Sequence, residues 1–250
     1  MDTADLAPYL APTQFLDSEE PSLVAFAKDA IGDAADDRTK AVRLFYAVRD
    51  SVRYDPYMTG VAVDDFRASQ ILSLGRGFCV PKAIALAACA RAVGVPARLG
   101  FADVRNHLAT EKLRERMGTD EFVFHGYVEL WLGGRWVKAT PTFNASLCEK
   151  FRVRPLDFDG EHDALFHPFD RDGNQHMEYL RYRGEFADFP MGEMLAAWQR
   201  SYPHLFGLGE TVEEVVQRVA VEQGDFEREA EEENAAPAPV APAAPANGVR

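Results

Sequence analysis

An alanine-rich apolar segment at residues 80–93 is the feature that most constrains the fold of this chain. Gly75 and Gly77, just before it, allow a tight backbone approach, and Pro81 suits a first helical turn because its missing N–H needs no partner there. Gly94 follows the segment and is a typical residue for ending a helix. Since the segment is too short to cross a bilayer, we predict a buried central helix.

Cys79 stands at the N-terminus of this predicted helix. Unpaired N–H groups and the positive end of the helix dipole favour a thiolate over a thiol at that position. Cys79 is therefore predicted to be a nucleophile with a lowered pKa. The alternative is that Cys79 is a small buried apolar residue, which is a common use of a single cysteine.

The chain of 250 residues is long enough for one sizeable domain with extensions, and such a domain can bury its core without disulfide or metal support. Its three cysteines are scattered and its N-terminus lacks the layout of a signal peptide, so we expect a reducing, cytoplasmic location. A formal net charge of −13 would repel phosphate backbones and anionic lipid. Nucleic acid and membranes are therefore not expected as partners, and the oligomeric state stays open.

Ahead of the central helix, the sequence predicts an arm followed by scaffold helices. Residues 1–21 are expected to form an extended arm, because Pro8 and Pro12 interrupt their first seventeen residues. Apolar residues at helical spacing then predict one helix over residues 22–31 and a second that begins behind Asp36. A short helical turn at residues 68–73 leads to the glycine-containing loop.

Behind the central helix, apolar and polar residues alternate, which is typical of strands. One strand is expected from Ala97, and a polar helical excursion at residues 108–117 follows it. Residues 122–132 and 135–140 are predicted to form a hairpin closed by Gly133 and Gly134. The register of a two-residue loop pairs Trp131 with Trp136, Glu129 with Lys138, Tyr127 with Thr140 and His125 with Thr142.

His125 lies near the start of the first hairpin strand, on the same face as Tyr127. A cysteine at a helix start and a histidine on a following strand are the nucleophile and base of a thiol acyl-transfer site, provided that the fold brings them together. The alternative is an imidazole that is held by ordinary hydrogen bonds and has no chemical role.

These motifs together resemble the transglutaminase-like superfamily over residues 40–145. The matching motifs are Gly77-Phe78-Cys79, Gly94-Val95-Pro96-Ala97-Arg98, His125-Gly126-Tyr127-Val128-Glu129 and Gly133-Gly134-Arg135-Trp136-Val137. The resemblance implies a papain-like α+β fold with N-terminal helices, in which the helix that begins at the cysteine packs against an antiparallel sheet. It also implies that Cys79 attacks an amide or acyl carbonyl and that His125 serves as base and then acid, without metal or organic cofactor.

One position departs from the family pattern. The family's imidazole-orienting aspartate stands just before Pro-Thr, and Thr140 stands there in Ala139-Thr140-Pro141-Thr142. A hydroxyl accepts a hydrogen bond from the imidazole but adds no negative charge, and loss of the equivalent carboxylate in serine proteases costs on the order of ten-thousand-fold in rate. Asn144 is the nearest other candidate, because an amide has this role in papain-like enzymes. More remote candidates are Asp103, Asp157 and Asp159.

Other polar residues have both a chemical and a structural interpretation. Gln70 can help to stabilise an oxyanion but equally suits an exposed helical position, and Arg76 can bind a substrate carboxylate or form a salt bridge. Cys89 is expected to pack among alanines. Cys148 is expected to be a half-buried free thiol.

Residues 146–206 extend the core, and together they give a predicted domain of residues 22–206. The extension is rich in Asp, His and Gly, but residues 170–174 lack the downstream glutamate of a calcium loop, so no metal site is predicted. A strand at residues 179–182 and a helix at residues 192–204 are expected to cover one side of the site. Residues 207–233 predict an acidic helix, including residues 212–221, and the Ala/Pro-rich residues 234–250 predict a disordered tail.

Two classes of function follow from these observations. The first is a thiol-dependent enzyme that hydrolyses an amide or peptide bond, or transfers its acyl group, in a peptide or protein substrate. An arylamine acetyltransferase-like reaction fits less well, because Arg76-Gly77-Phe78-Cys79 lacks the second glycine of that family. The second class is a catalytically weak or silent scaffold that binds peptides or a protein partner, and Thr140 favours it.

Overall fold

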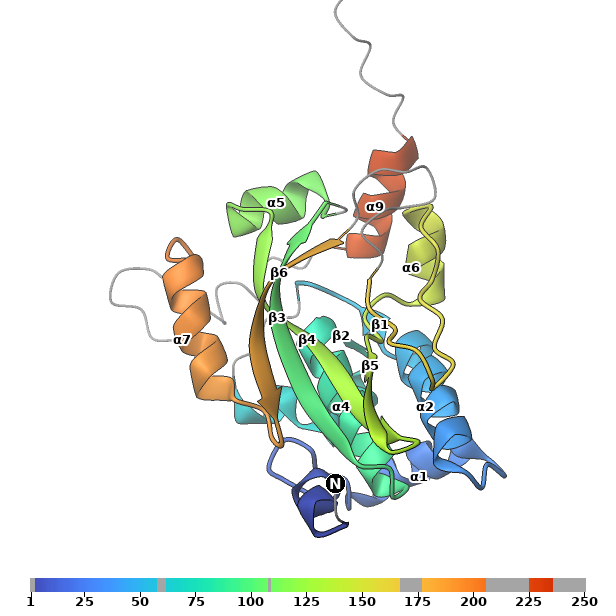
Figure 1. Ribbon diagram of the computed structural model, residues 1–250. Helices are drawn as coiled ribbons and strands as arrows, with labels where there is room; N and C mark the ends of the chain where they lie inside the picture. The colour runs from blue at the N-terminus through green and yellow to red at the C-terminus, as the bar shows by residue number, and fades with distance from the viewer. Residues whose placement is uncertain (1–2, 58–61, 108, 167–176, 206–224, 236–250) are drawn as a thin grey trace, which may run out of the picture.

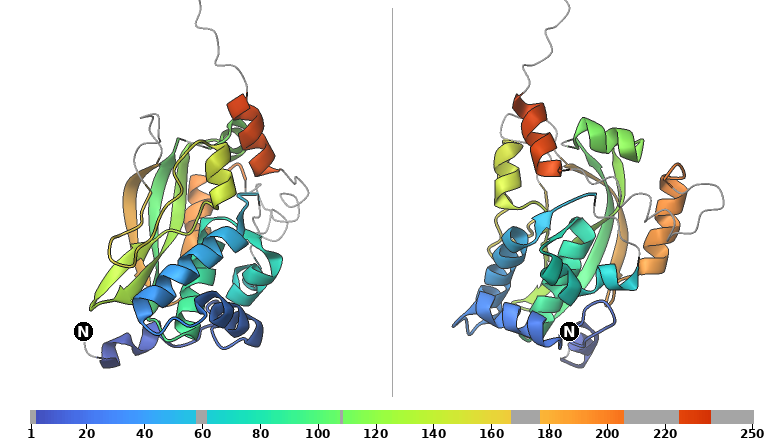
Figure 2. Two further views of the ribbon diagram at one scale, coloured as in Figure 1. Left: turned by 90° about the vertical axis from the view of Figure 1, so that its right-hand side faces the viewer. Right: turned by 180° about the vertical axis from the view of Figure 1, so that it is seen from behind.

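The computed structural model describes residues 3–57, 62–107, 109–166, 177–205 and 225–235. Its architecture is α+β, with a four-stranded antiparallel sheet packed against a group of helices, as the sequence predicts. Figure 1 shows the sheet crossing the centre of the molecule, and Figure 2 shows the N-terminal helices gathered on one side of it. Within these ranges, no helix combines the length and the apolar character that a membrane span requires.

The sheet has the strand order β5-β4-β3-β6, and every neighbouring pair is antiparallel. Its strands are β3 (Ala97–Asn106), β4 (Glu121–Leu132), β5 (Arg135–Ala139) and β6 (Met177–Phe186). Gly133 and Gly134 close the β4–β5 hairpin with φ values of 58° and 84°, the left-handed conformation that glycine adopts without strain. The predicted two-residue hairpin is therefore confirmed.

The predicted hairpin register holds only where both strands persist. Trp131 pairs with Trp136 and Glu129 with Lys138, as expected. The ladder then stops at the pair formed by Val128 and Ala139, because β5 ends there. The two further pairs expected from the register, Tyr127 with Thr140 and His125 with Thr142, are absent from this ladder.

Helix α4 (Cys79–Ala92) lies between the sheet and helices α1 and α2, and nearly all of its residues are buried. Burial of a lysine needs compensating hydrogen bonds, and Lys82 Nζ donates to the carbonyls of Arg49 and Val52 at the end of α2 (Asp37–Ser51). Burial lowers the pKa of Lys82 to about 7. This side chain anchors the central helix to its neighbour.

The other N-terminal elements agree with the prediction except at residues 3–9. Helices α1 (Pro21–Ile31), α2 and α3 (Ala68–Leu74) match the prediction, whereas residues 3–9 form the 3-10 helix η1 (Thr3–Tyr9) instead of an extended arm. The arm is held by burial of Leu16 and by Arg91, which donates from Nη1 to the carbonyl of Ala11 at 2.7 Å. A second short 3-10 helix is η2 (Val63–Phe66).

The remaining helices lie around the edges of the sheet. They are α5 (Glu111–Met117), α6 (Ala145–Lys150), α7 (Met191–Ser201) and α9 (Phe226–Ala235). The expected strand at residues 179–182 is the centre of β6, and the expected helix at residues 192–204 is α7. The expected helix at residues 212–221 and the tail beyond residue 235 lie outside the described residues.

Helix α9 is the described part of the predicted acidic segment, and it packs on the domain beside α6. Phe226 is 3% exposed and meets Tyr54 and Phe151, with ring centroids 5.5 and 5.6 Å apart. The Tyr57 hydroxyl donates to Glu229. An acidic sequence therefore contributes here to a buried interface.

Candidate active site

Two short segments fix Cys79 as the first residue of α4. β1 (Arg53–Tyr54) pairs in parallel with β2 (Arg76–Gly77), and the Asp55 amide donates to the carbonyl of Gly77 at 3.1 Å. A Cβ on Gly77 would lie 2.9 Å from the Pro81 Cβ, which is too close. The predicted helix start at Cys79 is therefore found in the structure, and the glycine beside it is needed for packing.

Strand β4 meets the start of α4 at Gly126. A Cβ there would lie 3.1 Å from the Val80 Cα and 3.4 Å from the carbonyl oxygen of Cys79. The Gly126 N–H is also one of the groups that act to lower the pKa of the Cys79 thiol. The structure thus brings the cysteine against the residue that follows His125 in the chain.

The Cys79 thiol does not have the lowered pKa that its helix position predicts. The N–H groups of Gly126, Val80 and Cys79 itself favour the thiolate, as expected for a helix start. Burial opposes them and is the larger effect, so the pKa of Cys79 rises to about 11, although the residue keeps partial exposure. The uncharged thiol is therefore the resting form at neutral pH.

His125 is buried, with 4% of its surface exposed, in a setting of aromatic rings. Its ring centroid lies 5.6 Å from that of Phe166 and 6.2 Å from that of Tyr179. Burial lowers the pKa of His125 to about 4, so the imidazole is neutral at neutral pH. Its Nε2 atom has no hydrogen-bond partner among the described residues.

The backbone before His125 is distorted. Phe124 has φ of 61°, a left-handed conformation that is uncommon for a bulky residue, and the register between β3 and β4 shifts near it. Asp103 accepts a hydrogen bond from the Phe124 amide at 3.1 Å and forms an ion pair with Arg183. Asp103 therefore stabilises the bend that precedes His125 through its Oδ1 atom, which accepts from both partners.

Thr140 lies just beyond β5 with 1% of its surface exposed. Its amide donates to the carbonyl of Ala164 at 3.0 Å, so the extension holds this segment from the outer side. The Thr140 hydroxyl is close enough to that of Tyr179 to lower its pKa, although burial raises the pKa of Tyr179 by more. The Thr140 hydroxyl, at the position where the sequence resemblance predicts an aspartate, therefore has the Tyr179 hydroxyl as its neighbour.

Asn144, the nearest alternative to Thr140, has other hydrogen-bond partners. Its Oδ1 accepts from the Tyr54 amide at 3.0 Å, and its Nδ2 donates to Ser146 at 2.7 Å and to Glu227 at 3.1 Å. These contacts join β1, the start of α6 and α9. The structure gives Asn144 an anchoring role and shows no hydrogen bond between it and His125 among the described residues.

The more remote acidic candidates also have partners away from His125. Asp157 accepts from the Tyr46 hydroxyl at 3.4 Å and from Arg154 at 3.2 Å. Asp159 binds the backbone and ring of His162. None of the carboxylates suggested by the sequence is therefore a hydrogen-bond partner of the imidazole in the described part of the chain.

Most of the other polar and cysteine candidates have the surroundings expected from their structural rather than their chemical interpretation. Gln70 is exposed on α3, and Arg76 lies 3.7 Å from Asp55 in a salt bridge. Cys89 is fully buried, as predicted. Cys148 is only 2% exposed, not half-buried, because α6 packs it into the core.

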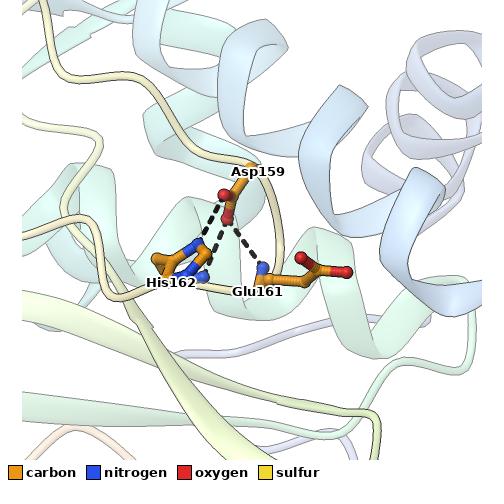
Figure 3. A group of neighbouring side chains, drawn as sticks. All are labelled: Asp159, Glu161 and His162. Atoms are coloured by element: carbon orange, nitrogen blue, oxygen red, sulfur yellow. Dashed lines mark hydrogen bonds and ion pairs between the residues drawn. The ribbon is translucent and has the colours of Figure 1, made fainter.

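Asp159, Glu161 and His162 form a group that sequence analysis did not single out as a site. One ligand atom from each lies within 4.8 Å of the others, and all three residues are exposed. Figure 3 shows the Asp159 carboxylate accepting hydrogen bonds from the backbone of Glu161 and from both the backbone and ring of His162. The Glu161 carboxylate pairs with Arg38. These contacts account for the group as a surface turn.

The extension supplies residues that the sequence analysis missed. Phe166 and Tyr179 contact the His125 ring, and Trp198 of α7 lies 5.8 Å from Phe78, just before Cys79. Alternation in residues 179–182 indicates a strand, but no sequence signal connects it to a histidine more than fifty residues away.

Residues 24–141 match the model of the transglutaminase-like superfamily. No sequence among the curated proteins matches the chain significantly. A crystal structure from Cytophaga hutchinsonii, described as that of a "putative cysteine protease", is similar with a TM-score of 0.45 and 21% sequence identity. The similarity covers 57% of this chain and spans 43% of that chain.

Proposed function

On the premise of a transglutaminase-like core at residues 24–141, we propose that this protein is a thiol-dependent enzyme that acts on the amide bonds of a peptide or protein. Cys79 is the nucleophile and His125 is the general base and acid. The observation that carries the proposal is the close approach of Gly126, the residue next to His125, to Cys79 at the start of α4, where a Cβ on Gly126 would lie 3.4 Å from the Cys79 carbonyl oxygen.

The reaction follows from the chemistry of the pair. The thiol proton passes to His125 while the sulfur bonds to the carbonyl carbon. The tetrahedral intermediate collapses with cleavage of the C–N bond, and the imidazolium gives its proton to the leaving amine. Water then attacks the thioester, passes a proton to His125, and the carboxylic acid leaves as the proton returns to sulfur. Hydrolysis is the simpler outcome, since water always competes with an amine acceptor.

The lowered pKa of His125 and the raised pKa of Cys79 support a neutral resting pair rather than a thiolate and an imidazolium. Proton transfer must then accompany the attack of sulfur, because neither charged form is stable in the resting site. The N–H groups of Cys79, Val80 and Gly126 that favour a thiolate are also suited to stabilise a developing oxyanion. The free thiols suit a reducing compartment such as the cytoplasm.

The test is an amide-hydrolysis screen with peptide p-nitroanilides and casein, and with hydroxylamine as acceptor to detect acyl transfer. Wild-type activity that Cys79→Ala and His125→Gln both remove supports the proposal. Cys148→Ala is the matched control, since it removes a buried thiol outside the site and should keep the activity.

A silent scaffold is the second candidate, favoured by Thr140 and by the high pKa of the Cys79 thiol. In that case no substrate is turned over, and alkylation of Cys79 by iodoacetamide is unchanged in His125→Gln. A peptide-binding titration with Cys79→Ala protein then measures the scaffold's affinity directly.

A further inference from the structure

Three buried polar atoms, one on His125 and two on side chains linked to it by contact, have no hydrogen bond of normal geometry among the described residues. They are Nε2 of His125, Oγ1 of Thr140 and the hydroxyl oxygen of Tyr179. Buried polar groups are nearly always hydrogen-bonded, and an unsatisfied one costs about 1–3 kcal/mol. Three such atoms on neighbouring side chains therefore need an explanation.

Contacts between these side chains bring the atoms into one neighbourhood. The Tyr179 ring meets the His125 ring edge-on, with centroids 6.2 Å apart and an angle of 78° between the planes. The Thr140 hydroxyl and the backbone of Phe166 lie close enough to the Tyr179 hydroxyl to act to lower its pKa, although burial raises this pKa by more. Tyr179 is positioned for this by β6, where it pairs with Val104 of β3.

We infer that Tyr179 and Thr140 together are the positioning residues of His125, and that their hydroxyl oxygens accept the Nε2–H of its imidazole in place of the family's aspartate. This inference rests on the proposed function of Cys79 and His125. It adds Tyr179, which comes from β6 and lies outside the residues 24–141 that match the family.

The chemistry of a hydroxyl suits this role. An imidazole with its proton on Nε2 has a lone pair on Nδ1, and that lone pair can receive the thiol proton. A hydroxyl accepts the Nε2–H without adding a negative charge, so it fixes the tautomer and the ring orientation but does not stabilise the imidazolium. Burial lowers the pKa of His125, and no neighbouring negative charge in the described part of the chain opposes this shift.

Two other acceptors that the sequence suggests for this role have partners elsewhere. Asp103 accepts a hydrogen bond from the Phe124 amide and pairs with Arg183. Asn144 has one side-chain oxygen, and this oxygen accepts from the Tyr54 amide. Tyr179 is the hydroxyl-bearing residue whose ring contacts the His125 ring, and Thr140 is the hydroxyl that lies beside it.

The test uses Tyr179→Phe, which keeps the ring and removes the hydroxyl, and Thr140→Asp, which restores the family's carboxylate. Tyr182→Phe is the matched control, because Tyr182 stacks on Tyr179 at 6.1 Å on the same strand but is 54% exposed. The first readout is the tautomer and pKa of His125 from nitrogen chemical shifts of the imidazole. The second is the rate of Cys79 alkylation and of any amide turnover.

We expect wild type and Tyr182→Phe to show mainly the Nε2–H tautomer, and Tyr179→Phe to show a mixture with a rate about tenfold lower, the value of one hydrogen bond. Thr140→Asp should raise the pKa of His125 by at least about one unit. In that background Tyr179→Phe should have little further effect, because the carboxylate replaces the hydroxyl.

An unchanged tautomer and pKa of His125 in Tyr179→Phe would overturn the inference. So would an equal effect of Tyr179→Phe with and without Thr140→Asp, since that indicates a purely structural role. A wrong proposed function would give another result. The rates of Cys79 alkylation and of amide turnover would then be the same in wild type and His125→Gln, whereas the imidazole nitrogen chemical shifts would still change in Tyr179→Phe.

Discussion

Gly126 lies against Cys79, two residues beyond the last pair of the β4–β5 ladder, so that a Cβ on Gly126 would be 3.4 Å from the Cys79 carbonyl oxygen. This part of β4 packs against the N-terminus of α4. The contact joins two segments almost fifty residues apart and lies beside His125. It is the basis for treating Cys79 and His125 as parts of one site.

The first prediction concerns the reactivity of Cys79. Alkylation needs the thiolate, and burial raises the pKa of this thiol to about 11 from its usual 9.0. The rate should therefore be low at pH 7 and rise about tenfold per pH unit until it approaches pH 11. Iodoacetamide labelling followed by mass spectrometry of the Cys79 peptide measures it. The control is the denatured chain, for which the alkylation rate should level off about two pH units lower. A rate for the folded protein that levels off below pH 8 would contradict the prediction.

The second prediction concerns stability in acid. The pKa of His125 is about 4 when folded and 6.5 when exposed, so the unfolded chain binds the proton more readily. The stability linked to His125 is fully present above pH 6.5 and is lost as pH falls toward 4, by an amount on the order of 3 kcal/mol.

Urea unfolding of wild type and His125→Gln at pH 7 and pH 4.5 isolates this effect from the carboxylates. The variant should lose less unfolding free energy than wild type between the two pH values. Equal losses in the two proteins would show that His125 is not held in its neutral form by the fold.

Local patterns in the sequence are enough to predict much of the scaffold. Gly133 and Gly134 determine the hairpin and its register, and the segment around Pro81 determines where α4 begins. These features depend on residues close together in the chain, where backbone sterics decide the outcome.

The environment of the site could not be predicted in the same way. The pKa of Cys79 depends on how much of the fold covers it, and the helix-start effect is present but smaller than burial. Tyr179 reaches His125 only because β6 pairs with β3 across a long insertion. Residues 3–9 likewise belong to a stretch whose prolines suggest an extended arm, yet they form η1.

The third prediction concerns the packing of β4 on β3. A Cβ on Gly100 would lie 2.2 Å from the ring of Tyr127, which pairs with it across the strands and is fully buried. Gly100→Ala should therefore force the ring to move and lower the free energy of unfolding by about 1–3 kcal/mol. Gly192→Ala is the control, because a Cβ there meets nothing within 4 Å. Urea unfolding checks both, and similar midpoints for the two variants would refute the clash.

The last prediction concerns α9, whose interface with the domain is built around Phe226. This ring is 3% exposed between Tyr54, Tyr57 and Phe151, so Phe226→Ala should remove about 3–5 kcal/mol from the docking of the helix. The helix should then detach while the sheet stays folded, because α9 contributes to no strand pairing. Hydrogen exchange should report faster exchange in residues 226–235 and at the Tyr54 amide that Asn144 holds, with little change in β3 and β4. Arg228→Ala, at an exposed ion pair of the same helix, should leave exchange near wild type; loss of protection throughout the sheet in Phe226→Ala would show that α9 is instead part of the cooperative core.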